Sequence, residues 1–163
     1  MSKSLYINFR DNGFWAYDVP SSVFLRFLID AADNQLTSGA NQWLSDAVQH
    51  WRVSAAISDL SHYADDHWSQ SEIDIVIELC RTATNAIRCG GDLPAREIES
   101  WPILDDRRIF TRGHDPVPCE PVARLGDAFI ALLQNTLPEP PERHWWFFTL
   151  DENTDTIVMR ADA

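Results

Sequence analysis

The start of the chain has the hydrophobic pattern of a β-hairpin. Between positions 5 and 10, Leu, Ile and Phe alternate with more polar residues, which is the period-two pattern of a half-buried strand. Asn12-Gly13 follows, a pair that readily adopts the positive φ angles of a tight turn. Residues 14–19 are therefore predicted to return as the second strand, which Pro20 ends.

The end of the chain predicts a second hairpin. Residues 144–150 are aromatic and strand-like, residues 151–154 favour a turn, and residues 155–160 favour another strand. Two terminal hairpins around a helical middle predict one antiparallel sheet covered by helices. The alternative is that each hairpin packs on the helices separately.

Between the hairpins, apolar residues recur at helical spacing in four segments. The predicted helices run from Ser21 or Ser22 to Asn34 or Leu36, from near Asn41 to about Ala55, from Ser69 to Gly90, and from about Pro121 to Leu137. Ser69 and Glu72 have the spacing of a capping box. Residues 58–69 lack periodicity, and residues 92–121 predict a long irregular connection with a short strand near 108–111.

These elements predict an α+β fold in which about four helices pack on an antiparallel sheet built from the N- and C-terminal hairpins. The length of 163 residues favours a single domain spanning residues 1–163. An apolar content of 45%, with seven Trp and eight Phe, is that of a chain with a packed core.

The composition also limits the classes of partner. The net charge of −12 and the pI of 4.6 argue against binding to nucleic acid, which requires clustered Lys and Arg. The longest apolar run, residues 128–133, is much shorter than the ~20 residues that span a bilayer. The N-terminus lacks the features of a secretory signal, and three Cys residues do not form a paired framework. We therefore expect a cytoplasmic protein that binds neither nucleic acid nor membrane.

Negative charge is concentrated in one third of the sequence. Between Phe27 and Cys80 there are nine acidic residues and a single basic one, Arg52, for a net charge of −8. Between Arg81 and Arg112 the charges nearly balance. The acidic stretch is either a solvated face that keeps the protein soluble or a docking surface for a basic partner.

The docking interpretation predicts specific contact residues. Aromatic anchors surrounded by acidic residues are typical of tight interfaces, although a Trp or Tyr in such a stretch is more often packed into the core. The predicted partner-binding residues are Asp59, Tyr63, Asp65, Asp66, Trp68, Glu72, Asp74 and Glu78, with Tyr63 or Trp68 as the anchor.

Motifs for catalysis or cofactor binding are weak. His62 and His67 flank two acidic residues, but a five-residue spacing does not place both imidazoles on one helical face. The Cys spacing does not fit a zinc site, and neither a nucleophile elbow nor a phosphate-binding loop occurs. We therefore predict no catalytic residues, no metal and no cofactor.

One stretch of the sequence resembles a broad class of known proteins. Phe14-Trp15-Ala16-Tyr17-Asp18-Val19-Pro20, running into Phe24-Leu25-Arg26-Phe27-Leu28-Ile29-Asp30, in a small, acidic, Trp-rich chain, resembles the immunity proteins of bacterial toxin systems. Proteins of that group bind and block a cognate toxin, often a nuclease. The resemblance implies an inhibitor with a toxin partner and assigns no site residues.

The leading hypothesis is an immunity-type inhibitor that neutralises a basic toxin domain through its acidic surface. The second is a non-catalytic adaptor or homo-oligomeric structural protein. The third is an enzyme that acts on a small cationic substrate held by the carboxylates.

Overall fold

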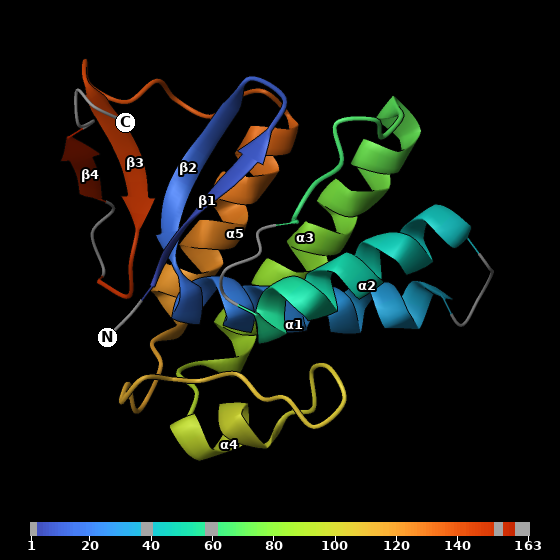
Figure 1. Ribbon diagram of the computed structural model, residues 1–163, viewed down its shortest axis with the longest axis vertical. Coiled ribbons are helices and arrows are strands. Elements are labelled where there is room, and N and C mark those ends of the chain that lie inside the picture. The colour runs from blue at the N-terminus through green and yellow to red at the C-terminus, as the bar shows by residue number, and fades with distance from the viewer. Residues whose placement is uncertain (1–2, 37–40, 58–61, 152–154, 159–163) are drawn as a thin grey trace.

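The computed structural model describes residues 3–36, 41–57, 62–151 and 155–158, the last of these by their backbone alone. The chain has an α+β fold (Figure 1). Its elements are β1 (Ser4–Phe9), β2 (Asn12–Tyr17), α1 (Asp18–Leu36), α2 (Gln42–Ala56), α3 (Gln70–Gly90), α4 (Ala95–Ser100), α5 (Cys119–Leu133), β3 (His144–Phe148) and β4 (Asp155–Val158).

The two terminal hairpins join in one sheet with the order β1-β2-β3-β4. Each hairpin is antiparallel, as predicted, but β2 and β3 run parallel, with Trp15 opposite Phe147 and Ala16 opposite Phe148. The prediction of a purely antiparallel sheet was therefore wrong at this junction. The reason is that all the helices lie between β2 and β3, and such a helical crossover can return the chain in the parallel direction.

The core lies between the sheet and the helices. Figure 1 shows α5 behind β1 and β2, and α5 also contacts β3, α1 and α3. Side chains from β1, β2, α1 and α5 meet there, and Ile7, Phe14, Phe24 and Phe129 are completely buried. None of the described helices has the length and apolar character needed to cross a membrane.

The first helix begins earlier than the sequence pattern predicts. α1 starts at Asp18 directly after β2, so Pro20 lies in its first turn, where a proline is tolerated because the N–H groups there have no helical partner. Asp18 is buried, and its Oδ2 accepts a hydrogen bond of 2.6 Å from Nε of Arg112. Its carboxylate is also favoured by the positive end of the helix dipole.

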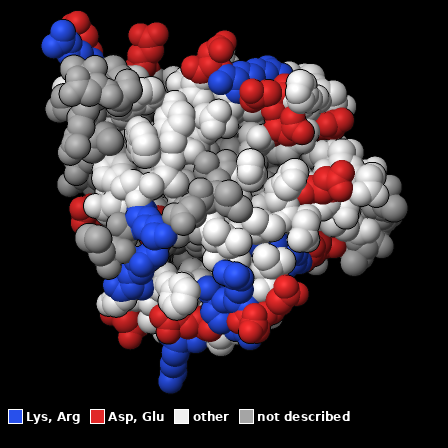
Figure 2. Space-filling model, viewed as in Figure 1, with Lys and Arg blue, Asp and Glu red and all other residues white. Residues whose placement is uncertain are grey.

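The region between α3 and α5 contains a fifth helix that was not predicted. The short helix α4 lies at the bottom of Figure 1, and the predicted strand near residues 108–111 does not form. Two isolated bridges, Leu93 with Val117 and Leu104 with Arg107, shape the loop instead. Figure 2 shows basic and acidic side chains intermixed along this edge of the molecule. Helix α5 then spans Cys119–Leu133. It begins two residues earlier and ends four residues earlier than the sequence predicts.

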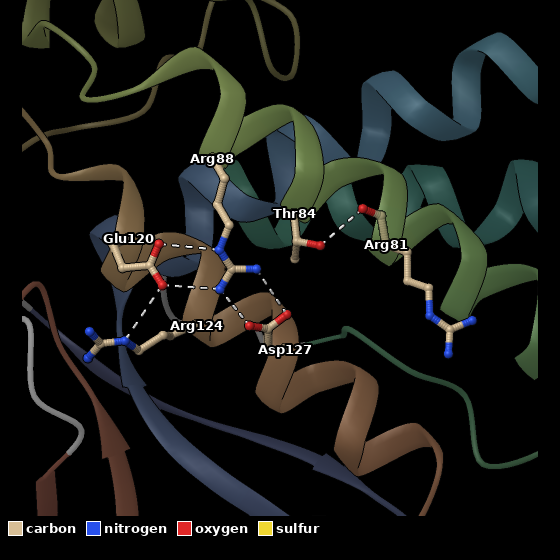
Figure 3. Close-up of polar contacts among 6 residues, drawn as sticks. All are labelled: Arg81, Thr84, Arg88, Glu120, Arg124 and Asp127. Carbon is tan, nitrogen blue, oxygen red and sulfur yellow. Dashed lines mark hydrogen bonds and ion pairs between the residues drawn. The ribbon is translucent and has the colours of Figure 1, made fainter.

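Helices α3 and α5 approach closely at Gly126. A Cβ atom built there would meet Cγ2 of Thr84 and would lie 2.8 Å from Cε2 of Phe24. Further along the same pair of helices, Arg88 donates to Glu120 (Nε to Oε2, 3.2 Å) and to Asp127 (Nη2 to Oδ2, 2.6 Å) (Figure 3). This ion pairing raises the pKa of Arg88 and lowers that of Glu120.

We expect Gly126→Ala to reduce the free energy of unfolding by about 1–2 kcal/mol, because the overpacking cost exceeds the gain in helix propensity of about 1 kcal/mol. Urea denaturation provides the measurement. Adding Thr84→Ser to Gly126→Ala removes the clashing methyl group, so the double variant should regain part of the lost stability. Gly90→Ala is the control, since a Cβ there meets nothing within 4 Å. Equal stability of the Gly126 and Gly90 variants would show that the close approach is unimportant.

We expect Arg88→Met to lower the free energy of unfolding by about 1 kcal/mol or less at pH 7, because the pairs are solvent-exposed. When folding lowers the pKa of a carboxylate, the carboxylate stabilises the folded state at pH values above its unfolded-state pKa. This stabilisation is lost as the pH falls through the folded-state pKa. The difference between wild type and variant should therefore shrink below about pH 4. A difference that is independent of pH would contradict the ion-pair explanation.

Candidate functional site

A pocket of about 510 Å³ opens between β1, α2, the segment 62–68 and the start of α3. Its lining combines aromatic rings, imidazoles and carboxylates. The lining residues are Asn8, Trp43, Asp46, Ala47, His50, Trp51, His62, Tyr63, Ala64, Asp65, Asp66, His67, Trp68 and Glu72.

One wall of the pocket is a single face of α2. The residues that α2 contributes are Trp43, Asp46, Ala47, His50 and Trp51. Their spacing of three and four residues places all five on the same side of a helix. Trp51 and Ala47 are buried, whereas Asp46 and His50 are exposed, so this face runs from the core to the solvent.

The opposite wall is the irregular segment 62–68, which side chains and backbone groups hold in place. The indole N–H of Trp51 donates to the backbone carbonyl of Tyr63 at 2.9 Å. The backbone N–H of His62 donates to Oγ of Ser54 at 3.0 Å. The N–H of Arg10, in the turn between β1 and β2, donates to Oδ1 of Asp66 at 2.7 Å. The segment is thus fixed to both α2 and the hairpin.

The two predicted anchors are part of this framework. Tyr63 is 2% exposed, and its ring packs edge-on against Phe129 of α5, with 6.2 Å between the ring centroids. Trp68 is 8% exposed and makes an edge-to-face contact with Trp43 at 6.2 Å. Both aromatics form the inner part of the pocket and do not project from the surface. Burial raises the pKa of Tyr63, so its phenol stays neutral.

The structure divides the predicted partner-binding residues into three groups. Asp65, Asp66 and Glu72 line the pocket together with Tyr63 and Trp68. Asp74 and Glu78 are exposed on α3 outside it, and Asp59 lies outside the described residues. That these residues contact a partner stays a prediction.

Sequence reasoning missed the contribution of α2. It predicted the helix from near Asn41 to about Ala55 but assigned no site role to Asp46 or His50. The available signal was the spacing of these two residues, which continues the Trp43 and Trp51 face toward the solvent.

Ion pairing neutralises three acidic residues of the acidic stretch outside the pocket. Asp30 pairs with Arg26 and Asp33 pairs with Arg52, and on α3 Glu78 pairs with Arg81. In the described part of the chain, no Lys or Arg forms an ion pair with the four pocket carboxylates, and none lines the pocket. Their hydrogen bonds come from neutral groups, such as Nε2 of Gln42 to Asp46 at 2.8 Å. The pocket therefore has four carboxylates that no described Lys or Arg neutralises.

The imidazoles of the pocket lie near one another without forming a metal site. The rings of His50 and His62 have centroids 5.8 Å apart and are tilted by 42°. Over the residues that the structure describes, no group of three or more His, Cys, Asp or Glu side chains is arranged to hold a metal ion. The arrangement is chemically suited to binding a cation with organic character, because carboxylates and aromatic rings both attract positive charge.

Comparison of the chain with known proteins gives no relative. No protein-family model, curated protein or solved structure matches it.

We expect Trp51→Phe to lower the free energy of unfolding by about 2–3 kcal/mol, because it leaves a cavity and removes the donor to the Tyr63 carbonyl. Chemical denaturation and the amide chemical shifts of residues 62–68 provide the measurements. Tyr63→Phe is the matched control: the Tyr63 hydroxyl is buried and, although the Ser21 side chain interacts with it, makes no hydrogen bond of good geometry within the described residues, so its loss should cost little. A smaller effect for Trp51→Phe than for Tyr63→Phe would show that the indole does not hold the segment.

Proposed function

We propose that the protein is an inhibitor of the immunity type, which binds a basic protein partner and blocks its functional surface. The observation that carries this proposal is the negative charge left unpaired around the pocket. Asp30 on α1, Glu78 on α3 and Glu120 on α5 pair with arginines, whereas Asp46, Asp65, Asp66 and Glu72 have no such partner among the described residues. A basic partner would supply the missing positive charges.

The layout of the pocket supports a protein as that partner. Buried rings form its inner part, and the exposed carboxylates of Asp46, Asp65 and Asp66 stand at its edge. An apolar centre that is surrounded by charged residues is the usual anatomy of a tight interface. Unpaired charge of one sign also accelerates association with a partner of opposite sign. A nuclease toxin has such a positive surface, because it must attract nucleic acid.

The size of the pocket favours one alternative, an enzyme or binding protein for a small cationic molecule. A volume of about 510 Å³ is in the range of small-molecule sites. The homo-oligomer alternative has less support, since Phe110 is the one large apolar side chain that is mostly exposed in the described part of the chain. We rank inhibition of a basic protein first because the carboxylates extend beyond the pocket to Asp74 on α3.

The proposal is tested by co-expressing the protein with the product of the gene directly upstream of it and measuring survival of the cells. We expect survival with the wild type and reduced survival with Asp46→Lys/Glu72→Lys. With purified proteins, the double variant should associate at least about tenfold more slowly at low salt, and its rate should depend less on salt concentration.

The matched control is Glu139→Lys/Glu142→Lys, which makes the same change of charge at exposed positions outside the pocket. It should protect cells as well as the wild type does. Equal protection by both double variants would exclude the pocket as the inhibitory surface. An upstream product that is harmless without the protein would argue against the immunity function.

A further inference from the structure

We infer that the pocket accepts an arginine side chain of the partner, an assignment that rests on the proposed function. The lining favours a cationic guest, because it contains four carboxylates and three imidazoles and, among the described residues, no Lys or Arg. These carboxylates come from α2, the segment 62–68 and α3, so they surround the space from several directions. A cation inside can therefore approach more than one of them.

The aromatic lining selects a flat cation. A guanidinium group is planar and weakly hydrated, stacks on aromatic rings and presents several N–H donors to carboxylates. An ammonium group is a compact, strongly hydrated charge that loses more on leaving water. Trp43 is half-buried at the pocket wall, with its ring at 73° to that of Trp68, and provides aromatic surface in the pocket that Asp46 and Glu72 also line.

The molecule already contains one such arrangement. The guanidinium carbon of Arg26 lies over the ring of Trp101, 5.4 Å from its centroid. The same guanidinium pairs with Asp30, with 3.1 Å between Nε and Oδ1, and donates from Nη1 to the carbonyl of Pro102 at 2.8 Å. A tryptophan, a carboxylate and a carbonyl thus bind one arginine internally. The pocket also combines tryptophan rings with carboxylates, and none of its described lining residues is an arginine.

The arginine assignment can be tested without the partner by titrating a tripeptide with blocked ends, Gly-Arg-Gly, into the ¹⁵N-labelled full chain. We expect saturable amide shifts at residues 43–51, 62–68 and 72. The corresponding Lys peptide should bind several-fold more weakly, and the citrulline peptide, which has nearly the same shape without the charge, should not bind measurably. Citrulline binding equal to that of arginine would overturn the assignment, as would shifts spread over the whole surface.

A pair of neighbouring residues on α3 provides the matched variants. Glu72 lines the pocket and Asp74 does not, although both lie near the start of the helix. Glu72→Gln should weaken binding of the Arg peptide about fivefold, since one carboxylate near a surface contributes on the order of 1 kcal/mol. Asp74→Asn should leave the affinity within about twofold. Equal losses would show that only the general negative field attracts the peptide.

Two further outcomes separate this inference from the proposed function. Tetramethylammonium competing at lower concentration than the Arg peptide would overturn the arginine assignment in favour of a site for quaternary ammonium groups. Peptide binding in the pocket without protection in the co-expression assay would leave the arginine site standing and remove the inhibitory function. Protection without any peptide-induced shift would remove the arginine site and leave the inhibitory function standing.

Discussion

The hydrogen bond from the indole of Trp51 to the carbonyl of Tyr63 determines where the acidic segment lies. It joins α2 to a stretch of chain that has no regular structure of its own. Tyr63 can take this position because its ring fits against Phe129 in the core, so the fold of α5 and the location of the pocket are linked. Asp65 and Asp66, two and three residues further on, are placed at the pocket as a result. The bonds from the His62 N–H to Ser54 and from the Arg10 N–H to Asp66 hold the same segment at two further points.

The net charge by itself describes only solubility. The distribution of ion pairs shows where on the protein acidic residues are left without a basic partner. Arginines on α1, α2 and α3 neutralise acidic residues locally, and the network around Arg88 does so between α3 and α5. Such exposed pairs contribute little to stability individually. Their effect on the surface is to neutralise charge where they form, and none of them forms with a pocket carboxylate among the described residues. The pocket therefore places four carboxylates without an arginine partner beside aromatic rings and imidazoles.

The sequence predicted those features that depend on local signals. The first hairpin and the cap at Ser69, whose Oγ accepts from the N–H of Glu72 at 3.3 Å, both form as expected. The turn of the hairpin lies two residues earlier than predicted, at Arg10-Asp11, where Arg10 has a positive φ of 53°, and Asn12 and Gly13 are the first residues of β2. The parallel pairing of β2 with β3 could not be predicted, because it depends on how the intervening helices pack. Helix α4 has six residues, too few to show a period. The pocket escaped prediction for a similar reason: Asp46 meets the segment 62–68 only through tertiary contacts.

The parallel β2–β3 junction also determines when the fold can be completed. Trp15 pairs with Phe147, so the centre of the sheet joins residues from opposite ends of the chain. During synthesis, the first hairpin emerges early and has one strand edge without its partner until β3 leaves the ribosome. Closing so long a loop is slow, and an unpaired edge is open to association with other chains. The order of synthesis thus leaves the aromatic strand β2 exposed throughout the translation of all five described helices.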